Sequence, residues 1–210
     1  MQRGLLWTEI EWKRPDEIKL HSEWENVPQV YIDGCSADDI QQGHLGDCYF
    51  LSCLSVLADH PGMIERLIVT PSVTPSGVFA ARFCKHGEWH DVLLDDRFPC
   101  IQRNDTDQDD DAPEDEDRHD AALKAALTLD VDPISGDKKK HWSPAFSQAK
   151  EGELWPSILE KAWAKVHGSY QAIESGDPGS TLRDLTGAPS VGICIQIDEF
   201  CIQMRNFVKW

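Results

Sequence analysis

The sequence predicts a protein of the α+β class. Two segments, 47–59 and 153–167, carry apolar residues at three- and four-residue spacings, which is typical of helices with a buried face. Two shorter segments, 77–84 and 88–96, are rich in apolar residues and are separated by the turn sequence Lys-His-Gly. We therefore expect a central buried helix, a second long helix packed near it, and a small antiparallel sheet formed by the two strands.

The bulk composition limits the class of partner. The chain has 210 residues, which suits one domain with a real core, and its net charge is −17. Such an acidic chain is not expected to bind nucleic acid or an anionic membrane, and no run of about 18 apolar residues predicts a membrane span. The N-terminus lacks a signal-peptide core, and the seven cysteines show no C-x-x-C spacing. We expect a cytoplasmic protein with free thiols.

The first predicted helix, 47–59, has a cysteine in its first turn. Asp47 is expected as its N-cap or as a first-turn acid, and Cys48 follows at once. A thiol at this place points toward unpaired backbone N–H groups and the positive end of the helix dipole, which favours the thiolate. Gly43 and Gly46 are expected to allow a tight turn and to leave room for a substrate chain.

A glutamine upstream completes a possible catalytic group. The side-chain amide of Gln42 and the backbone N–H of Cys48 can together donate hydrogen bonds to the oxygen of a carbonyl that Cys48 attacks. The alternative, which is the usual fate of an isolated cysteine in a reducing compartment, is a free core cysteine at the start of a helix. The stretch predicts either a nucleophile with its oxyanion hole or a structural thiol.

The other elements have weaker signals. The second helix has Pro156 in its first turn and Gly168 just beyond its last turn. Residues 1–40 show no clear period and are expected to be irregular. We also expect loops over 30–40 and 174–180, a helical turn over 181–187 and a strand over 191–197.

Residues 102–145 interrupt the regular pattern. The tract 105–120 holds ten acidic residues against one arginine, more than half of the net charge of the chain. Low hydrophobicity and like charge predict a disordered, acidic surface insertion. No EF-hand spacing occurs in it, so a calcium loop of that kind is not expected.

Several stretches resemble one family. The pattern Q-G-x-L-G-D-C followed by an aromatic residue, at 42–49, resembles the active-site signature of calpains, which are papain-like, calcium-dependent cysteine endopeptidases. Residues 153–176 resemble the family's E-x-W-x-x-L-L-E-K-A-Y-A-K-x-x-G-S-Y segment, and 182–188 resemble the D-x-T-G-G that follows. The resemblance covers 12–100 and 145–190. It implies a papain-like cysteine protease fold, specifically the N-terminal, Cys-bearing subdomain.

The resemblance also implies roles for single residues. Cys48 would be the nucleophile and Gln42 the oxyanion donor. A Ca²⁺ site would use two backbone carbonyls and two carboxylates, from Ile32, Gly34, Asp39 and Glu153. Hard oxygen ligands of this kind suit Ca²⁺. From the residues alone, the alternative is that Asp39 is a solvated loop acid and Glu153 an acid at a helix N-terminus.

The chain departs from the family pattern at two points. Tyr49 stands where the family usually has Trp, and neither a G-H-A-Y-type histidine nor an N-x-W asparagine occurs. We therefore expect residues 1–210 to form a partial catalytic domain without the His/Asn subdomain. Its partners would be protein or peptide substrates and the missing second subdomain, and the chain alone would be inactive. The alternatives are a non-proteolytic calpain-like calcium-binding or regulatory protein, and a soluble protein with inherited motifs.

Overall fold

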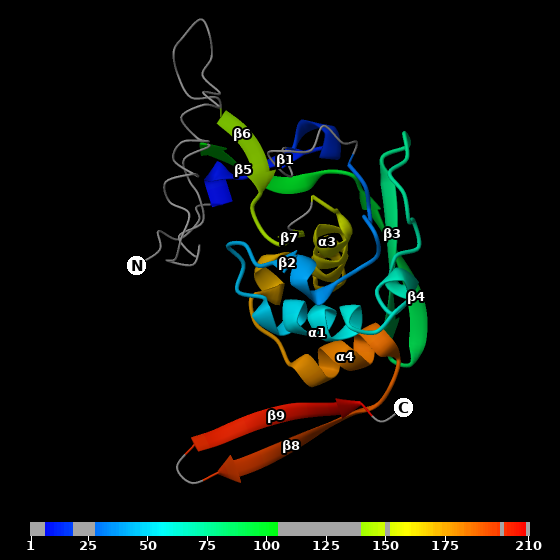
Figure 1. Cartoon of the computed structure of the whole chain (residues 1–210), viewed down its shortest axis with the longest axis vertical. Coiled ribbons are helices and arrows are strands. Elements are labelled where there is room, and N and C mark those ends of the chain that lie inside the picture. The colour runs from blue at the N-terminus through cyan, green and yellow to red at the C-terminus, as the bar shows by residue number, and fades with distance from the viewer. Residues whose placement is uncertain (1–6, 19–27, 105–139, 150–151, 198–199, 209–210) are drawn as a thin grey trace, which may run out of the picture.

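The computed structural model describes residues 7–18, 28–104, 140–149, 152–197 and 200–208. Within these residues the α-helices are α1 (Cys48–Ala58), α3 (Trp155–His167) and α4 (Pro178–Thr186), and they pack beside a long β-hairpin (Figure 1). The strands are β1 (Glu11–Lys13), β2 (Ile40–Gln41), β3 (Val78–Lys85), β4 (Glu88–Asp95), β5 (Phe98–Asn104), β6 (Lys140–Pro144), β7 (Gln148–Ala149), β8 (Ser190–Ile197) and β9 (Phe200–Val208). The mixed content confirms the predicted α+β class.

Helix α1 confirms the first predicted helix within one residue at each end. Asp47 is its N-cap residue, but its side chain makes no capping hydrogen bond. The predicted apolar face is buried, with Phe50 and Leu54 fully inside the core. Cys48 is the first residue of the helix, as predicted.

Helix α3 lies at the centre of the core. Ten of its residues are buried, Pro156 stands in its first turn, and Gly168 ends it with a φ of +102°. Trp163 joins three elements, because its ring stacks on Phe50 of α1 at 5.1 Å and meets Phe83 of β3 edge-on at 5.4 Å. None of the helices among the described residues is long and apolar enough to cross a membrane.

The sheets are more numerous than the sequence predicts. The β3–β4 hairpin is the expected antiparallel sheet, with Phe79 opposite Leu94. A second, three-stranded sheet has the order β1-β5-β6, and the short pair β2–β7 sets Gln41 opposite Gln148. Strand β8 covers the strand predicted at 191–197 and pairs with β9. Pair β2–β7 matters for function, because it places the turn before Cys48 against the chain that leads into α3.

Two predicted boundaries are corrected. The loop predicted at 174–180 ends earlier, because α4 begins at Pro178 and the Asp177 side chain accepts a hydrogen bond from the Ser180 N–H at 2.8 Å. The insertion predicted at 102–145 is narrower, because 102–104 and 140–144 are paired strands of β5 and β6. The rest of that insertion, including the acidic tract, lies outside the described residues.

Candidate active site

Cys48, the predicted nucleophile, is accessible to solvent. Cys48 is exposed, whereas Cys53, Cys84 and Cys100 are buried and Cys35 is half-buried; all five are free thiols. Because the first N–H groups of a helix have no partner within the helix, the Cys48 backbone N–H is available to a ligand at this end of α1. Geometry of this kind suits a nucleophile and does not suit a cysteine that serves only to fill the core.

The predicted oxyanion donor is held by its own turn. Gln42 donates one amide N–H to the backbone carbonyl of Leu45 at 2.8 Å. A glutamine amide has two N–H donors, so this bond orients the side chain and leaves the second donor available. Leu45 itself is buried, and it anchors the turn between Gln42 and Cys48 in the core.

The prediction that the two glycines of the turn leave room for a substrate chain is wrong, because the protein's own backbone occupies that space. A Cβ at Gly43 would come within 2.6 Å of the Phe146 Cα and closer still to its carbonyl group. A Cβ at Gly46 would meet the Glu174 carbonyl oxygen at 3.2 Å. Both glycines have negative φ, so their role is close approach of the protein's own backbone. The turn before Cys48 therefore packs closely against two other segments, at Phe146 before α3 and at Glu174 before α4.

Tyr49 forms a wall next to the nucleophile. Its hydroxyl accepts a hydrogen bond from the Trp163 indole N–H at 3.1 Å. A Cβ at Gly176 would lie 2.8 Å from that hydroxyl oxygen and overlap the ring, so the tyrosine fills the space beside this glycine. The side chain thus ties the first turn of α1 to α3 and to the 174–177 loop.

Two of the predicted calcium ligands lie together. The Ile32 N–H donates to one carboxylate oxygen of Glu153, and the Trp155 indole N–H donates to the other at 2.9 Å. Glu153 is buried, and the chain beside it turns at Gly34 with a φ of +106°. The 30–34 loop is therefore held against Glu153, although Glu153 lies 121 residues after Ile32.

Asp39 faces the same region from the short helix η3 (Ala37–Asp39). Its carboxylate accepts a hydrogen bond from the Ser36 N–H at 2.7 Å. Burial, and then the negative charges of Glu65, Glu153 and Asp39, raise the pKa of the Cys35 thiol. The negative charges of three carboxylates from different segments thus act on Cys35. Within the described residues, however, no group of three or more His, Cys, Asp or Glu side chains lies close enough to hold a metal ion. Glu65, in η4 (Glu65–Leu67), was not predicted from the sequence.

Sequence reasoning also missed a residue behind the nucleophile. Asp47 and Glu160 are both buried, and their carboxyl groups act on each other. Glu160 stands between Leu159 and Lys161 in α3, and no local pattern indicates that it meets Asp47, 113 residues earlier in the chain. A buried acid needs a partner, but which residue supplies it depends on the tertiary fold.

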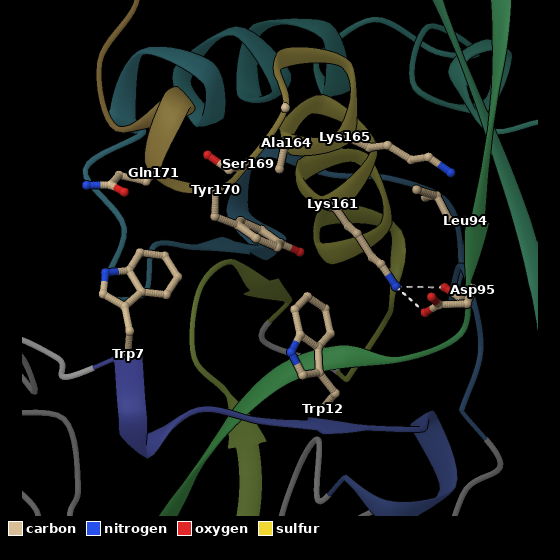
Figure 2. A pocket seen from close by; sticks show the side chains of 11 residues that line it. Trp7, Trp12, Leu94, Asp95, Lys161, Ala164, Lys165, Ser169, Tyr170 and Gln171 are labelled. Carbon is tan, nitrogen blue, oxygen red and sulfur yellow. Dashed lines mark hydrogen bonds and ion pairs between the residues drawn. The ribbon is translucent and has the colours of Figure 1, made fainter.

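A cavity of about 580 Å³ lies elsewhere. Figure 2 shows it between the N-terminal segment, which carries Trp7 and Trp12, and the C-terminal part of α3. The Trp12 and Tyr170 rings lie 6.3 Å apart, and Lys161 donates to Asp95 at 2.5 Å at its edge. None of its lining residues is a predicted catalytic or calcium-binding residue.

Comparison with known proteins defines the class. A family model described as calpain family cysteine protease matches residues 4–111 and 129–208. The match includes the exposed cysteine at the start of α1 and the whole of α3, so the chain is of the cysteine protease class. The chain belongs to the calpain family.

Individual relatives agree. A calpain-type cysteine protease from maize is 35% identical and one from rice is 32% identical, each over 95% of this chain and 8% of the relative. Calpain-A of Drosophila melanogaster is 31% identical over 86% of this chain and 17% of its own length. The chain therefore spans less than a fifth of these relatives.

Proposed function

We propose that this chain is the Cys-bearing half of a papain-like, calcium-dependent endopeptidase that cleaves peptide bonds through a thioester on Cys48. The observation that supports this most directly is the exposed Cys48 thiol at the N-terminus of a helix whose neighbouring turn is clamped on two sides. The free thiols among the described cysteines agree with a reducing cytoplasm.

The reaction follows from the residues at the turn. The Cys48 sulfur attacks the carbonyl carbon of a substrate peptide, and its negative charge passes to the carbonyl oxygen. The Cys48 N–H and the second Gln42 amide N–H donate hydrogen bonds to that oxygen. The C–N bond then breaks, the amine leaves with a proton from an imidazole, and water hydrolyses the thioester. The imidazole would come from a His/Asn subdomain, and we expect residues 1–210 to need that subdomain for activity.

Calcium would bind to the segments that hold the turn before Cys48, not to the catalytic residues themselves. Ile32 and Gly34 would supply carbonyl oxygens, and Asp39 and Glu153 would supply carboxylates. The fit is supported by the contact of the Ile32 N–H with Glu153, which holds two of these four residues together, and by the negative charges of Glu153 and Asp39 that both act on Cys35. A bound Ca²⁺ would neutralise these charges and tie the 30–39 loop to the start of α3.

Activity tests the proteolytic part of the proposal. The 210-residue chain is expected not to hydrolyse casein, whereas a product of the same gene that includes a His/Asn subdomain is expected to do so with Ca²⁺. Cys48→Ala abolishes this activity. Gln42→Ala lowers kcat by about 100-fold, since one oxyanion donor is lost. The matched control is Gln41→Ala, because Gln41 accepts a hydrogen bond from Gln148 outside the turn. Equal activity of Cys48→Ala and wild type would refute the mechanism.

Calorimetry with Ca²⁺ tests the metal site separately. Asp39→Ala is expected to abolish the heat of Ca²⁺ binding to the chain. Asp38→Ala is the control, because Asp38 carries the same charge on the same short helix and is exposed. Identical titrations of wild type and Asp39→Ala would remove Asp39 from the ligand set.

The second candidate is a calpain-like protein that binds calcium or a partner without proteolysis. It retains Asp39 and Glu153 but needs neither an oriented Gln42 nor an accessible thiol. The exposure of Cys48 and the hydrogen bond that orients Gln42 favour the protease.

A further inference from the structure

A pair of acidic side chains is buried behind the nucleophile. Asp47 is 0% exposed and Glu160 is 2% exposed, and their carboxyl groups lie against each other. The Ser147 N–H donates to both oxygens of Glu160, at 3.1 and 3.2 Å. Among the described residues neither carboxyl oxygen of Asp47 has a hydrogen-bond partner as long as Glu160 is ionised, because two carboxylates can only accept. The neighbouring cation, Lys161, points away to Asp95.

Two buried carboxyl groups in contact cannot both be ionised at low cost. Burial raises the pKa of Asp47 to about 6, and the contact with Glu160 opposes that rise. Burial and the nearby Asp47 charge raise the pKa of Glu160 well above its ordinary value. At neutral pH the pair therefore shares one proton, which resides on Glu160, and Asp47 carries the charge.

Two tyrosines near the pair stay neutral at neutral pH, and the charged neighbours Lys161 and Asp95 pair with each other. Tyr170 is buried beside Glu160 and Ser147, and burial together with these carboxylates raises its pKa. Burial also raises the pKa of Tyr49 on α1.

The position of Asp47 governs the first turn of α1. Its backbone carbonyl accepts hydrogen bonds from the Phe50 N–H at 2.8 Å and the Leu51 N–H at 3.2 Å. Its side chain does not cap the helix, and the groups that act on its carboxyl group are the Glu160 side chain and the backbone of Asp47 itself. A change at Asp47 is transmitted to the next residue, Cys48.

We propose that Glu160 is a positioning residue for Cys48: its protonated carboxyl group donates a hydrogen bond to the Asp47 carboxylate and so holds the start of α1. This inference depends on the proposed role of Cys48 as a nucleophile. If the donor is lost, a buried carboxylate is left without a partner, and Asp47 must either take up a proton or move toward solvent. Either change alters the charge or the geometry beside the Cys48 sulfur.

The test is the rate at which iodoacetamide alkylates Cys48 in the 210-residue chain between pH 5 and 9, followed by mass spectrometry of the Cys48 peptide. Glu160→Leu has a similar volume and no donor, and it is expected to slow alkylation about tenfold or to move the pH profile by about one unit. Glu160→Gln keeps an N–H donor for Asp47 and an acceptor for Ser147, so it is expected to stay within about threefold of wild type.

A second variant, Asp47→Asn, tests the same inference in case Glu160→Leu does not fold. Asp47→Asn keeps the shape and deletes the titrating charge, so an inflection near pH 6 in the wild-type profile is expected to disappear. Urea unfolding of each variant separates altered reactivity from lost structure.

The outcomes distinguish this inference from the function on which it depends. A folded Glu160→Leu variant with the rate and profile of wild type would overturn it, as would a Glu160→Gln variant as slow as Glu160→Leu. An unchanged profile in Asp47→Asn would overturn it too. If wild-type Cys48 reacts no faster than the buried cysteines, the proposed nucleophile itself is wrong.

Discussion

Replacing Gly43 with alanine tests the close packing that holds the turn before Cys48. An added Cβ would lie 2.5 and 2.6 Å from the backbone C and Cα atoms of Phe146, closer than real Cβ contacts allow. The obstacle is backbone on both sides, so no side-chain rotation relieves it. The His44 N–H also donates to the Ala145 carbonyl at 3.0 Å beside this contact, and a shift would weaken that bond.

The size of the effect follows from these contacts. Overpacking of a core costs about 1–3 kcal/mol, and loss of a backbone hydrogen bond adds about 1 kcal/mol. The lower entropy of the unfolded alanine chain offsets about 0.5 kcal/mol. We therefore expect Gly43→Ala to lower the free energy of unfolding by about 3 kcal/mol, which is a fall in Tm of about 9 °C for a chain of this size.

Urea unfolding followed by tryptophan fluorescence measures this change. Gly46→Ala is the matched control, since its Cβ would meet one atom, the Glu174 carbonyl oxygen, at 3.2 Å. Its free energy of unfolding is expected to stay within about 1 kcal/mol of wild type. If the two variants unfold at the same urea concentration, the close approach of Gly43 to Phe146 is not a feature of the protein.

Two further variants test contacts around α3. Tyr49→Phe is expected to lower the free energy of unfolding by about 1 kcal/mol, because the Trp163 N–H loses its acceptor. The control is Tyr31→Phe, whose buried hydroxyl has no hydrogen-bond partner in the described part of the chain; it is expected to change that free energy by less than about 0.5 kcal/mol. Equal losses would contradict the assignment of the bond. Burial acts to raise the pKa of Asp95, but the Lys161 ammonium prevails and lowers it. A carboxyl group whose pKa is lower in the folded than in the unfolded state stabilises the folded protein at pH values above its unfolded-state pKa. Asp95→Asn is therefore expected to lower the free energy of unfolding by about 0.5 kcal/mol at pH 7, and this difference from wild type should vanish as the pH falls below about 4. Urea titrations at pH 7 and pH 3 check this, and a difference that persists at pH 3 would exclude the ion pair as its cause.

The helices were predictable because their signals are local. The apolar spacing in 47–59 and 153–167 indicates one buried face in each case, and both helices form within two residues of the predicted ends. Helix α4 carries an equally local signal, an aspartate followed by proline at the first helical position. The glycine and proline residues around its start nevertheless predict a loop there, and this competing signal hides the beginning of the helix.

The β1-β5-β6 sheet was not predictable in the same way. Glu11 pairs with Cys100, and Ile101 pairs with Ser143. Short strands with partners tens of residues away have no period long enough to identify them, and their pairing depends on which surfaces the core leaves to be covered. For the same reason, strands 102–104 and 140–144 were included in the predicted insertion.

The sequence by itself determined that a cysteine begins a buried helix and that a glutamine precedes it by six residues, since both statements concern neighbours along the chain. Only the tertiary structure decided how that turn is held. Gly43 and Gly46 are small because distant backbone occupies the space beside them, and Glu160 keeps its proton because folding buries it against Asp47. Close approach and charge state depend on burial, and burial is created by contacts between segments that are far apart in sequence.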